Sequence, residues 1–236
     1  MADAETQAGT MPGYRRSVRI TSECNAVRAE LEDDFHCMEV RVAHDGARVL
    51  AVEAHMHRAP WTTCPGAMAQ LRETLLGQAL RDITPRLEKP RNCTHLHDLA
   101  VVAAAHAGEP GVTHYAMAIS DPVDGRRFHS ITRGGELVHQ WEEVDGTFVA
   151  PAGLAGLTSR GMRDWIAALP EGERMAARLL QVAAVISSGR TFPWERAEAP
   201  ADMPPVCFTW QPERAKIARR LDPVFEFSRS GRLPLE

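Results

Sequence analysis

The chain has 236 residues, of which 44% are hydrophobic and 25% are charged, and its formal net charge is −4. This length can bury one sizeable core, and the composition is typical of an ordinary globular domain. The arginines are spread along the sequence, which argues against a nucleic-acid-binding protein. No stretch approaches the roughly 18 consecutive apolar residues of a membrane helix, so we expect no membrane association.

The first residues and the cysteines indicate the compartment. Residues 1–13 are acidic, small and polar and lack the basic start and apolar core of a signal peptide. We therefore expect residues 1–14 to form a flexible tail. The five cysteines have no regular spacing and do not form a disulfide framework. The sequence thus predicts a cytoplasmic protein with reduced thiols.

Residues 15–58 alternate between extended patterns and turns, which is typical of a small antiparallel sheet. The turn signal Asp45-Gly46 lies between strand patterns at residues 38–42 and 49–55 and predicts a hairpin. In the first strand the apolar side chains fall on even numbers, so His36 points inward if the strand extends back to it. His55 and His57 are two residues apart on the second strand and must point the same way.

Two helices are expected next. Thr62-Thr63-Cys64-Pro65 precedes apolar residues at helical spacing, and Gly77 suits the end of this helix. The second helix begins near Thr94 and continues into the apolar run 99–107. Because this run is apolar all round, we expect the second helix to be buried between other layers.

Cys64 and Cys93 then each lie at a helix start. Backbone amides and the helix dipole favour negative charge there, so anions bind and thiol pKa values fall. The same field disfavours protonation of His95. A site built from both helix starts is suited to a carboxylate, a phenolate or a metal-bound thiolate.

The second half of the chain adds strands and one long helix. Residues 112–149 are expected to form a β-meander that either extends the first sheet or packs across it, and residues 171–187 form the strongest later helix. Residues 190–205 are rich in proline and acid and predict a long C-terminal loop, followed by a short strand at 206–210. The expected fold is α+β. It is a single domain, residues 15–236, with an antiparallel sheet, which can be strongly curved, packed against two or three helices.

Several short motifs within residues 15–107 resemble those of one protein family. They are Asp33-Asp34 before His36-x-Met38, Pro60-x-x-x-Cys64, and Cys93-Thr94-His95-Leu96 at a helix start. On these motifs the N-terminal half is similar to a bacterial family catalogued as a domain of unknown function. Asn92 departs from the family pattern, in which a glycine commonly precedes the cysteine. The meander and the C-terminal part look like additions.

The resemblance implies a site and a substrate class. It implies that His36, Cys64, Cys93 and His95 form one spatial cluster. It also implies that the protein accompanies the breakdown of aromatic compounds in bacteria, including lignin-derived compounds. It supplies no established reaction.

Each candidate residue also has a purely structural interpretation. Cys64 and Cys93 are either buried thiols that fill space, catalytic or anion-binding groups, or metal ligands. The spacing His55-x-His57 suits binding of a metal or a substrate, and an ordinary pair of histidines at a sheet rim has the same spacing. Arg58 suits bidentate binding of a carboxylate, or it is an exposed charge at a strand end.

We expect an enzyme, a cofactor-independent lyase or decarboxylase acting on a small carboxylated aromatic compound. The expected catalytic residues are His36, His55 and His95, and the expected substrate-binding residues are Arg58, His57, Cys64, Cys93 and Thr94. One alternative is a metal-dependent hydrolase or lyase, in which His36, Cys64, Cys93 and His95 hold a divalent metal such as zinc. The other is a non-catalytic protein that binds aromatic acids. A homodimer is compatible with the sequence.

Overall fold

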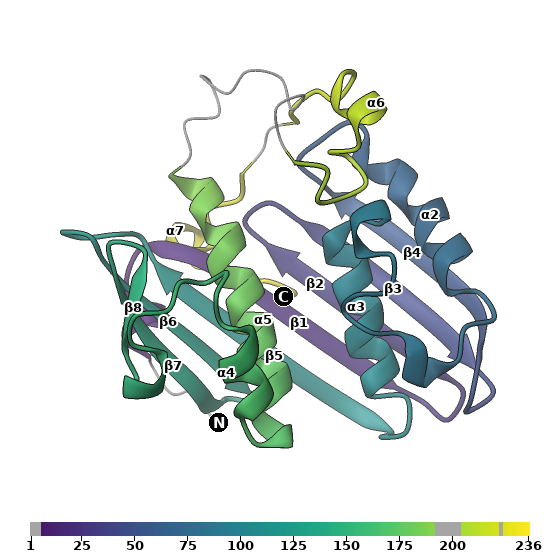
Figure 1. Ribbon diagram of the computed structural model, residues 1–236, viewed down its shortest axis with the longest axis horizontal. Coiled ribbons are helices and arrows are strands. Elements are labelled where there is room, and N and C mark those ends of the chain that lie inside the picture. Colours follow the sequence, from purple (N-terminus) through teal and green to yellow (C-terminus); the bar gives the residue numbers. More distant parts are fainter. Residues whose placement is uncertain (1–5, 192–203, 222–223) are drawn as a thin grey trace.

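The computed structural model describes residues 6–191, 204–221 and 224–236. Eight strands form one antiparallel sheet that is not closed (Figure 1). In chain order they are β1 Gly13–Ser22, β2 Ala26–Asp33, β3 Cys37–His44, β4 Val49–Arg58, β5 Gly111–Ser120, β6 Arg126–Arg133, β7 Glu136–Val144 and β8 Thr147–Ala150. Their order across the sheet is β4-β3-β2-β1-β5-β6-β7-β8, so the predicted meander extends the first sheet through the pairing of β5 with β1.

The longer helices cover one face of this sheet (Figure 1). The α-helices are α1 Gln7–Thr10, α2 Ala67–Leu75, α3 Thr94–Ala105, α4 Arg163–Ala168, α5 Glu171–Ser187, α6 Pro212–Ala215 and α7 Phe227–Ser230. Single 3-10 turns are η1 Cys64–Gly66, η2 Leu80–Asp82, η3 Lys89–Arg91, η4 Ala152–Leu154 and η5 Ser188–Arg190. Figure 1 shows α3 and α5 in front of the sheet, where α3 packs on β2 and β3 and α5 packs on β5 and β6. The α+β fold with an antiparallel sheet and packed helices is therefore confirmed.

Strand alternation fixes which side chains face the helices. In β2 the side chains of Val27, Ala29 and Leu31 are buried and those between them are at least partly exposed. Burying the apolar positions of each strand against α3 removes them from water, which stabilises the fold by about 25 cal/mol per Å² of apolar surface. Asp33 has the same parity as these apolar residues and is itself fully buried. The alternation thus directs one carboxylate into the interior.

The two predicted helix starts occur where expected. Cys64 opens the turn η1 that leads into α2, and Cys93 is the N-cap of α3, which ends at Ala105. Helix α3 is almost completely buried, as its apolar sequence predicted. The long later helix, α5, has the predicted bounds of residues 171–187. Both helix starts that carry a cysteine therefore lie near the same end of the sheet as the N-terminal end of β3.

Three other expectations have a different outcome. Residues 6–14 are packed: Thr6 caps α1 and its hydroxyl lies 2.8 Å from that of Ser130, so a flexible tail is wrong for this part, and residues 1–5 lie outside the described residues. Most of the predicted loop 190–205 also lies outside them. Residues 206–210 form turns, not a strand, because the amide of Phe208 bonds the carbonyl of Asn92 at 2.9 Å and not a neighbouring strand.

Within the described residues, none of the helices combines the length and apolarity that crossing a membrane requires.

Candidate active site

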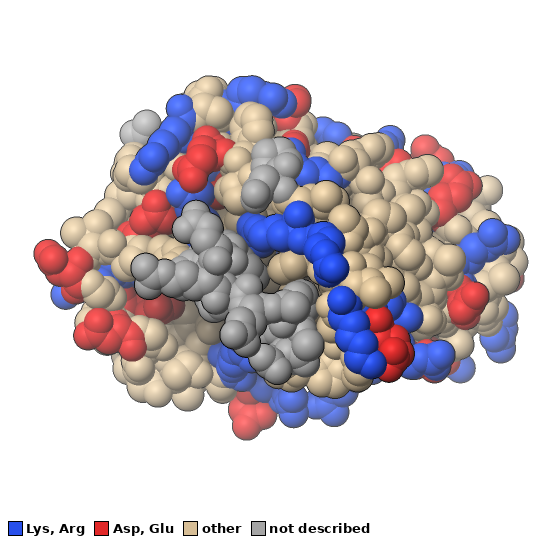
Figure 2. Space-filling model, turned by 90° about the horizontal axis from the view of Figure 1, so that it is seen from above, with Lys and Arg blue, Asp and Glu red and all other residues tan. Residues whose placement is uncertain are grey.

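A cavity of about 600 Å³ lies at the end of the sheet where α3 begins and α5 ends. The segment 204–221 contributes part of its wall. Aromatic side chains in the lining include Phe35, Trp61 and Trp210, and basic ones are Lys89, Arg160 and Arg220. Figure 2 looks down on this end of the molecule and shows lysine and arginine side chains gathered near its centre. The cavity is thus partly aromatic and positively charged.

Asp33, the last residue of β2, is the centre of a buried polar network beside this cavity. Its Oδ2 accepts hydrogen bonds from the Tyr14 hydroxyl at 2.7 Å and from Arg16 Nη1 at 3.1 Å. Its Oδ1 accepts the backbone N–H groups of Phe35 and His36 at 2.8 and 2.7 Å. Burial opposes ionisation, but the charges of His36 and Arg16 outweigh it and hold the pKa of Asp33 well below its usual range. Asp33 is therefore an anion with several donors.

His36 completes an Asp–His dyad with this carboxylate. Its Nδ1 lies 2.9 Å from Asp33 Oδ1 and 3.2 Å from Oδ2. An ionised carboxylate only accepts hydrogen bonds, so Nδ1 carries the hydrogen and Nε2 has the free lone pair in the neutral ring. His36 lines the cavity, on the side that strand alternation predicted. Such a carboxylate fixes both the tautomer and the orientation of the imidazole, as a general base requires.

His95, in the first turn of α3, stacks on His36. The ring centroids are 3.8 Å apart and the planes are inclined by 32°. Burial, together with the nearby charges of His36 and Arg16, holds the pKa of His95 well below its usual range. Burial is the largest cause, rather than the helix field that the sequence suggested. His95 is therefore neutral, and the stacked pair accommodates one positive charge at a time.

The polar atoms of His95 are only partly engaged. Its Nδ1 lies 3.9 Å from the thiol of Cys93, a weak contact. Its Nε2 is buried and makes no hydrogen bond to any of the described residues. An unpaired buried nitrogen has a free-energy cost of about 1–3 kcal/mol, and such costs are typical of sites that gain a partner when a ligand binds.

Three cysteines line the cavity, namely Cys64, Cys93 and Cys207. Burial raises the pKa of Cys93 to about 12 and that of Cys207 to about 11. Burial also raises the pKa of Cys64, whose Sγ lies 3.4 Å from Thr209 Oγ1. The expectation of lowered thiol pKa values at the helix starts is wrong, because burial outweighs the stabilising backbone amides. These groups are neutral thiols at physiological pH.

The remaining lining residues supply charge and hydrogen-bond donors. Lys89 Nζ pairs with Asp98 at 2.6 Å, and the guanidinium of Arg220 lies 5.8 Å from the centre of the Trp61 ring. Arg160 is exposed and makes no ion pair with the described residues. Thr94 also lines the cavity.

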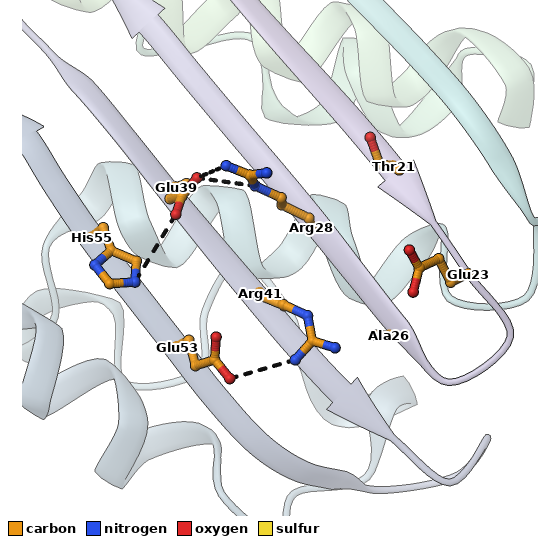
Figure 3. Close-up of a pocket in the computed structure, with 8 residues that line it drawn as sticks. All are labelled: Thr21, Glu23, Ala26, Arg28, Glu39, Arg41, Glu53 and His55. Atoms are coloured by element: carbon orange, nitrogen blue, oxygen red, sulfur yellow. Dashed lines mark hydrogen bonds and ion pairs between the residues drawn. The ribbon is translucent and has the colours of Figure 1, made fainter.

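His55 and His57 lie on the opposite face of the sheet. Their rings stack at 6.3 Å, so they point the same way, but neither lines the cavity. Figure 3 shows His55 beside Glu39, 4.0 Å away, and the ion pair of Arg41 with Glu53. They do not form the wall opposite the helix starts, because alternation in β4 directs Val52, Ala54 and Met56 toward the helices.

Arg58, expected to bind a substrate carboxylate, is not in the cavity lining either. It ends β4 at a register shift opposite Cys37 and Met38, and it pairs with Glu32 at 3.3 Å. Glu32 alternates with the buried Asp33 and lies on the outer face. Arg58 therefore lies outside the cavity that His36 lines.

The structure brings His36, Cys64, Cys93, Thr94 and His95 together around one cavity. Four of these were considered as a metal site. Among the residues that the structure describes, no three His, Cys, Asp or Glu side chains are placed to hold one ion together. The hydrogen bond between His36 Nδ1 and Asp33 leaves Nε2 of His36 as the nitrogen that can accept a proton or bind a ligand.

Tyr14, Arg16 and Asp33 were not identified as site residues from the sequence. A signal was present, because Arg16 alternates in step with the apolar Tyr14, Val18 and Ile20, and Asp33 does so with Leu31. Arg16 and Asp33 are also paired residues across β1 and β2. A charged residue at an inward position on each of two paired strands indicates a buried ion pair.

One family model matches part of the chain that carries this site. Residues 15–108 match the family model described as protein of unknown function (DUF2889). The match includes both strands of the dyad and all of α3. It leaves β5, β6, β7, β8 and α5 outside. No curated protein matches the chain.

Proposed function

We propose that this protein, whose dyad and helix α3 lie within the DUF2889 region, is a cofactor-independent lyase or decarboxylase acting on a small carboxylated aromatic compound. The observation that carries the proposal is the Asp33–His36 dyad stacked on the neutral His95 at 3.8 Å. A base with a fixed tautomer beside a neutral imidazole is suited to general acid–base catalysis, which contributes typically about 10²–10⁴-fold to a rate.

His36 is the proton-transferring residue in this proposal. For an aromatic acid that carries a hydroxyl group, Nε2 takes the hydroxyl proton and returns it to the ring or side-chain carbon that holds the carboxylate. The bond from that carbon to the carboxylate then breaks and carbon dioxide leaves. One proton from solvent restores the hydroxyl group, so one proton is consumed for each carbon dioxide released.

The cavity supports an aromatic acid as the substrate. Its volume of about 600 Å³ is within the range of about 300–1,000 Å³ that small-molecule sites occupy. Trp61 and Trp210 pack edge to face at 4.9 Å and offer an aromatic wall. Arg160, without an ion pair among the described residues, provides a positive charge for the carboxylate.

The test is an assay of hydroxylated benzoates and cinnamates in deuterium oxide. Carbon dioxide release is measured together with deuterium at the vacated carbon, and binding is measured by tryptophan fluorescence. We expect His36→Gln to lower kcat by about 10²–10⁴-fold and Arg160→Gln to raise KM. His57→Gln is the matched control, because His57 is exposed on the other face, and it should leave both unchanged.

Two results would contradict the proposal. Saturable binding of aromatic acids without any turnover would identify a binding protein instead of an enzyme. If no aromatic acid is bound or turned over, aromatic acids are not the substrate class. Full activity in His36→Gln would show that the dyad is not catalytic, although the reaction itself takes place.

A further inference from the structure

The dyad lies on a tight turn, residues 33–36, that other parts of the chain hold from outside. The turn closes through the amide of Asp33, which bonds the carbonyl of His36 at 2.8 Å. The carbonyl of Asp34 accepts the amide of Phe225 at 2.7 Å. The side chain of Asp34 pairs with Arg190 of η5. The turn is therefore fixed by contacts distant in sequence.

Arg58 reaches both ends of this turn. Its Nη2 donates to the carbonyl of Asp33 at 2.5 Å and to the carbonyl of His36 at 3.3 Å. The same nitrogen pairs with Glu32, the residue before the turn, at 3.3 Å. One guanidinium group thus contacts the two dyad residues through their backbone, while the His36 side chain lines the cavity and the Asp33 side chain is fully buried.

The C-terminal segment holds the guanidinium in place. Its carbon Cζ lies 5.7 Å from the ring centre of Phe225 and 5.9 Å from that of Phe227. These two rings are 4.4 Å apart. A cation over the face of an aromatic ring is attracted by the ring's π-electrons, more strongly where water is excluded. The arginine is therefore oriented on one side by aromatic rings and on the other by carbonyl groups.

We propose that Arg58 is a positioning residue: clamped by Phe225 and Phe227, it holds the 33–36 turn so that the His36 imidazole stays hydrogen-bonded to Asp33 and stacked on His95. This inference rests on the proposed function for its catalytic consequence. On this inference, Arg58 binds the backbone of the 33–36 turn and does not bind the substrate. It also makes the C-terminal segment, outside the matched family region, part of the active-site support.

The geometry makes arginine the suitable residue here. Several acceptors lie within 3.3 Å of one nitrogen of a planar group whose face can rest on an aromatic ring. A lysine ammonium is a compact point charge and cannot combine that flat contact with both carbonyl groups. A shift of the turn by about 1 Å moves the imidazole by a similar amount, and such misplacement can lower a rate about 10²-fold.

The test follows the His36 ring by NMR in protein labelled with ¹⁵N-histidine. Long-range ¹H–¹⁵N spectra report the tautomer, and the bonded Nδ1 proton gives a downfield resonance that His36→Gln assigns by removing it. We expect the unaltered chain to show the Nδ1–H tautomer with this resonance and Arg58→Gln to lose the resonance. In the same variant kcat should fall about 10²-fold, while KM stays unchanged.

Arg41→Gln is the matched control. Arg41 is an arginine on the same face of the sheet, pairs with Glu53 at 3.4 Å and does not contact the turn. It should keep both the resonance and kcat. If Arg58→Gln does not fold by circular dichroism, Arg58→Lys carries the test, with the same loss expected.

Persistence of the Nδ1 resonance in a folded Arg58 variant would overturn this inference. An equal loss in Arg41→Gln would also overturn it, because the effect would then belong to any charge on that face. The NMR measurement needs no substrate. If the Arg58 variant loses the resonance but the unaltered protein turns over no aromatic acid, the proposed function is contradicted and the positioning role of Arg58 is not.

Discussion

Replacing Asp33 by asparagine tests the network that the proposed chemistry depends on. The substitution keeps the size of the side chain but removes its charge. Asp33 accepts five hydrogen bonds, from Tyr14, Arg16, the amide of Phe35 and two groups of His36. The NH₂ group of the asparagine side chain is a hydrogen-bond donor, and it would lie among neighbours that are also donors. Arg16 is left buried without its carboxylate.

The expected loss of stability is large. Arg16 and Asp33 side chains are 1% and 0% exposed, and removing one partner of a buried ion pair costs about 3–5 kcal/mol. For a chain of this size that lowers Tm by about 6–20 °C. The pKa of Asp33 is lowered in the folded state. Its stabilising effect is therefore present above the unfolded pKa of about 4 and is lost as the pH falls through the folded-state pKa.

The assay is urea unfolding of both proteins between pH 2 and pH 8, with kcat measured at a temperature where both are folded. The difference in unfolding free energy should be constant above about pH 5 and shrink as the pH falls below the unfolded pKa of about 4. The rate should fall by about 10²–10⁴-fold, since the imidazole loses its orienting carboxylate. A difference below about 1 kcal/mol, the range of a surface ion pair, would refute the assignment of a buried, ionised Asp33.

Two further predictions concern neighbouring groups. Burial raises the pKa of Asp34 to about 7, against the effect of Arg190, so ionisation of this residue destabilises the fold. In urea unfolding, Asp34→Asn should therefore gain stability relative to the unaltered chain as the pH rises from about 4 to 7, and the difference should stay constant at higher pH. A difference that does not change with pH would contradict this. Native alkylation with iodoacetamide, followed by mass spectrometry, should modify the exposed Cys24 first and leave Cys93, whose pKa is about 12, unmodified; rapid labelling of Cys93 would contradict its burial.

Local sequence patterns predicted the elements that form the inner side of the site. The apolar run after Thr94 gave a buried helix, and the observed α3 spans Thr94–Ala105. Alternation in β3 predicted that His36 faces inward, one residue before the strand begins. Both predictions use only the period of the side chains along an element. For that reason they can be made without knowing which elements pack against the helix or the strand.

Long-range packing determined what the sequence did not predict. A register shift opposite Cys37 and Met38 accompanies the placement of Arg58 on the outer face, and alternation alone does not include such shifts. The pKa of Cys93 rises because α3 is buried, whereas the helix-start argument considered an exposed helix end. The segment 206–210 bonds Asn92 through Phe208, a contact between residues more than a hundred positions apart.

The buried charges give His36 and His95 different roles in the proposed reaction. Arg16 and Asp33 face each other across β1 and β2, so their charges largely cancel, and the Asp33 carboxylate accepts the hydrogen bond from Nδ1 of His36. A second proton on His95 is disfavoured, because that ring is buried and stacked 3.8 Å from the first. In the reaction that we propose, His36 carries the proton taken from the substrate. His95, neutral and with Nε2 unpaired among the described residues, hydrogen-bonds the substrate itself.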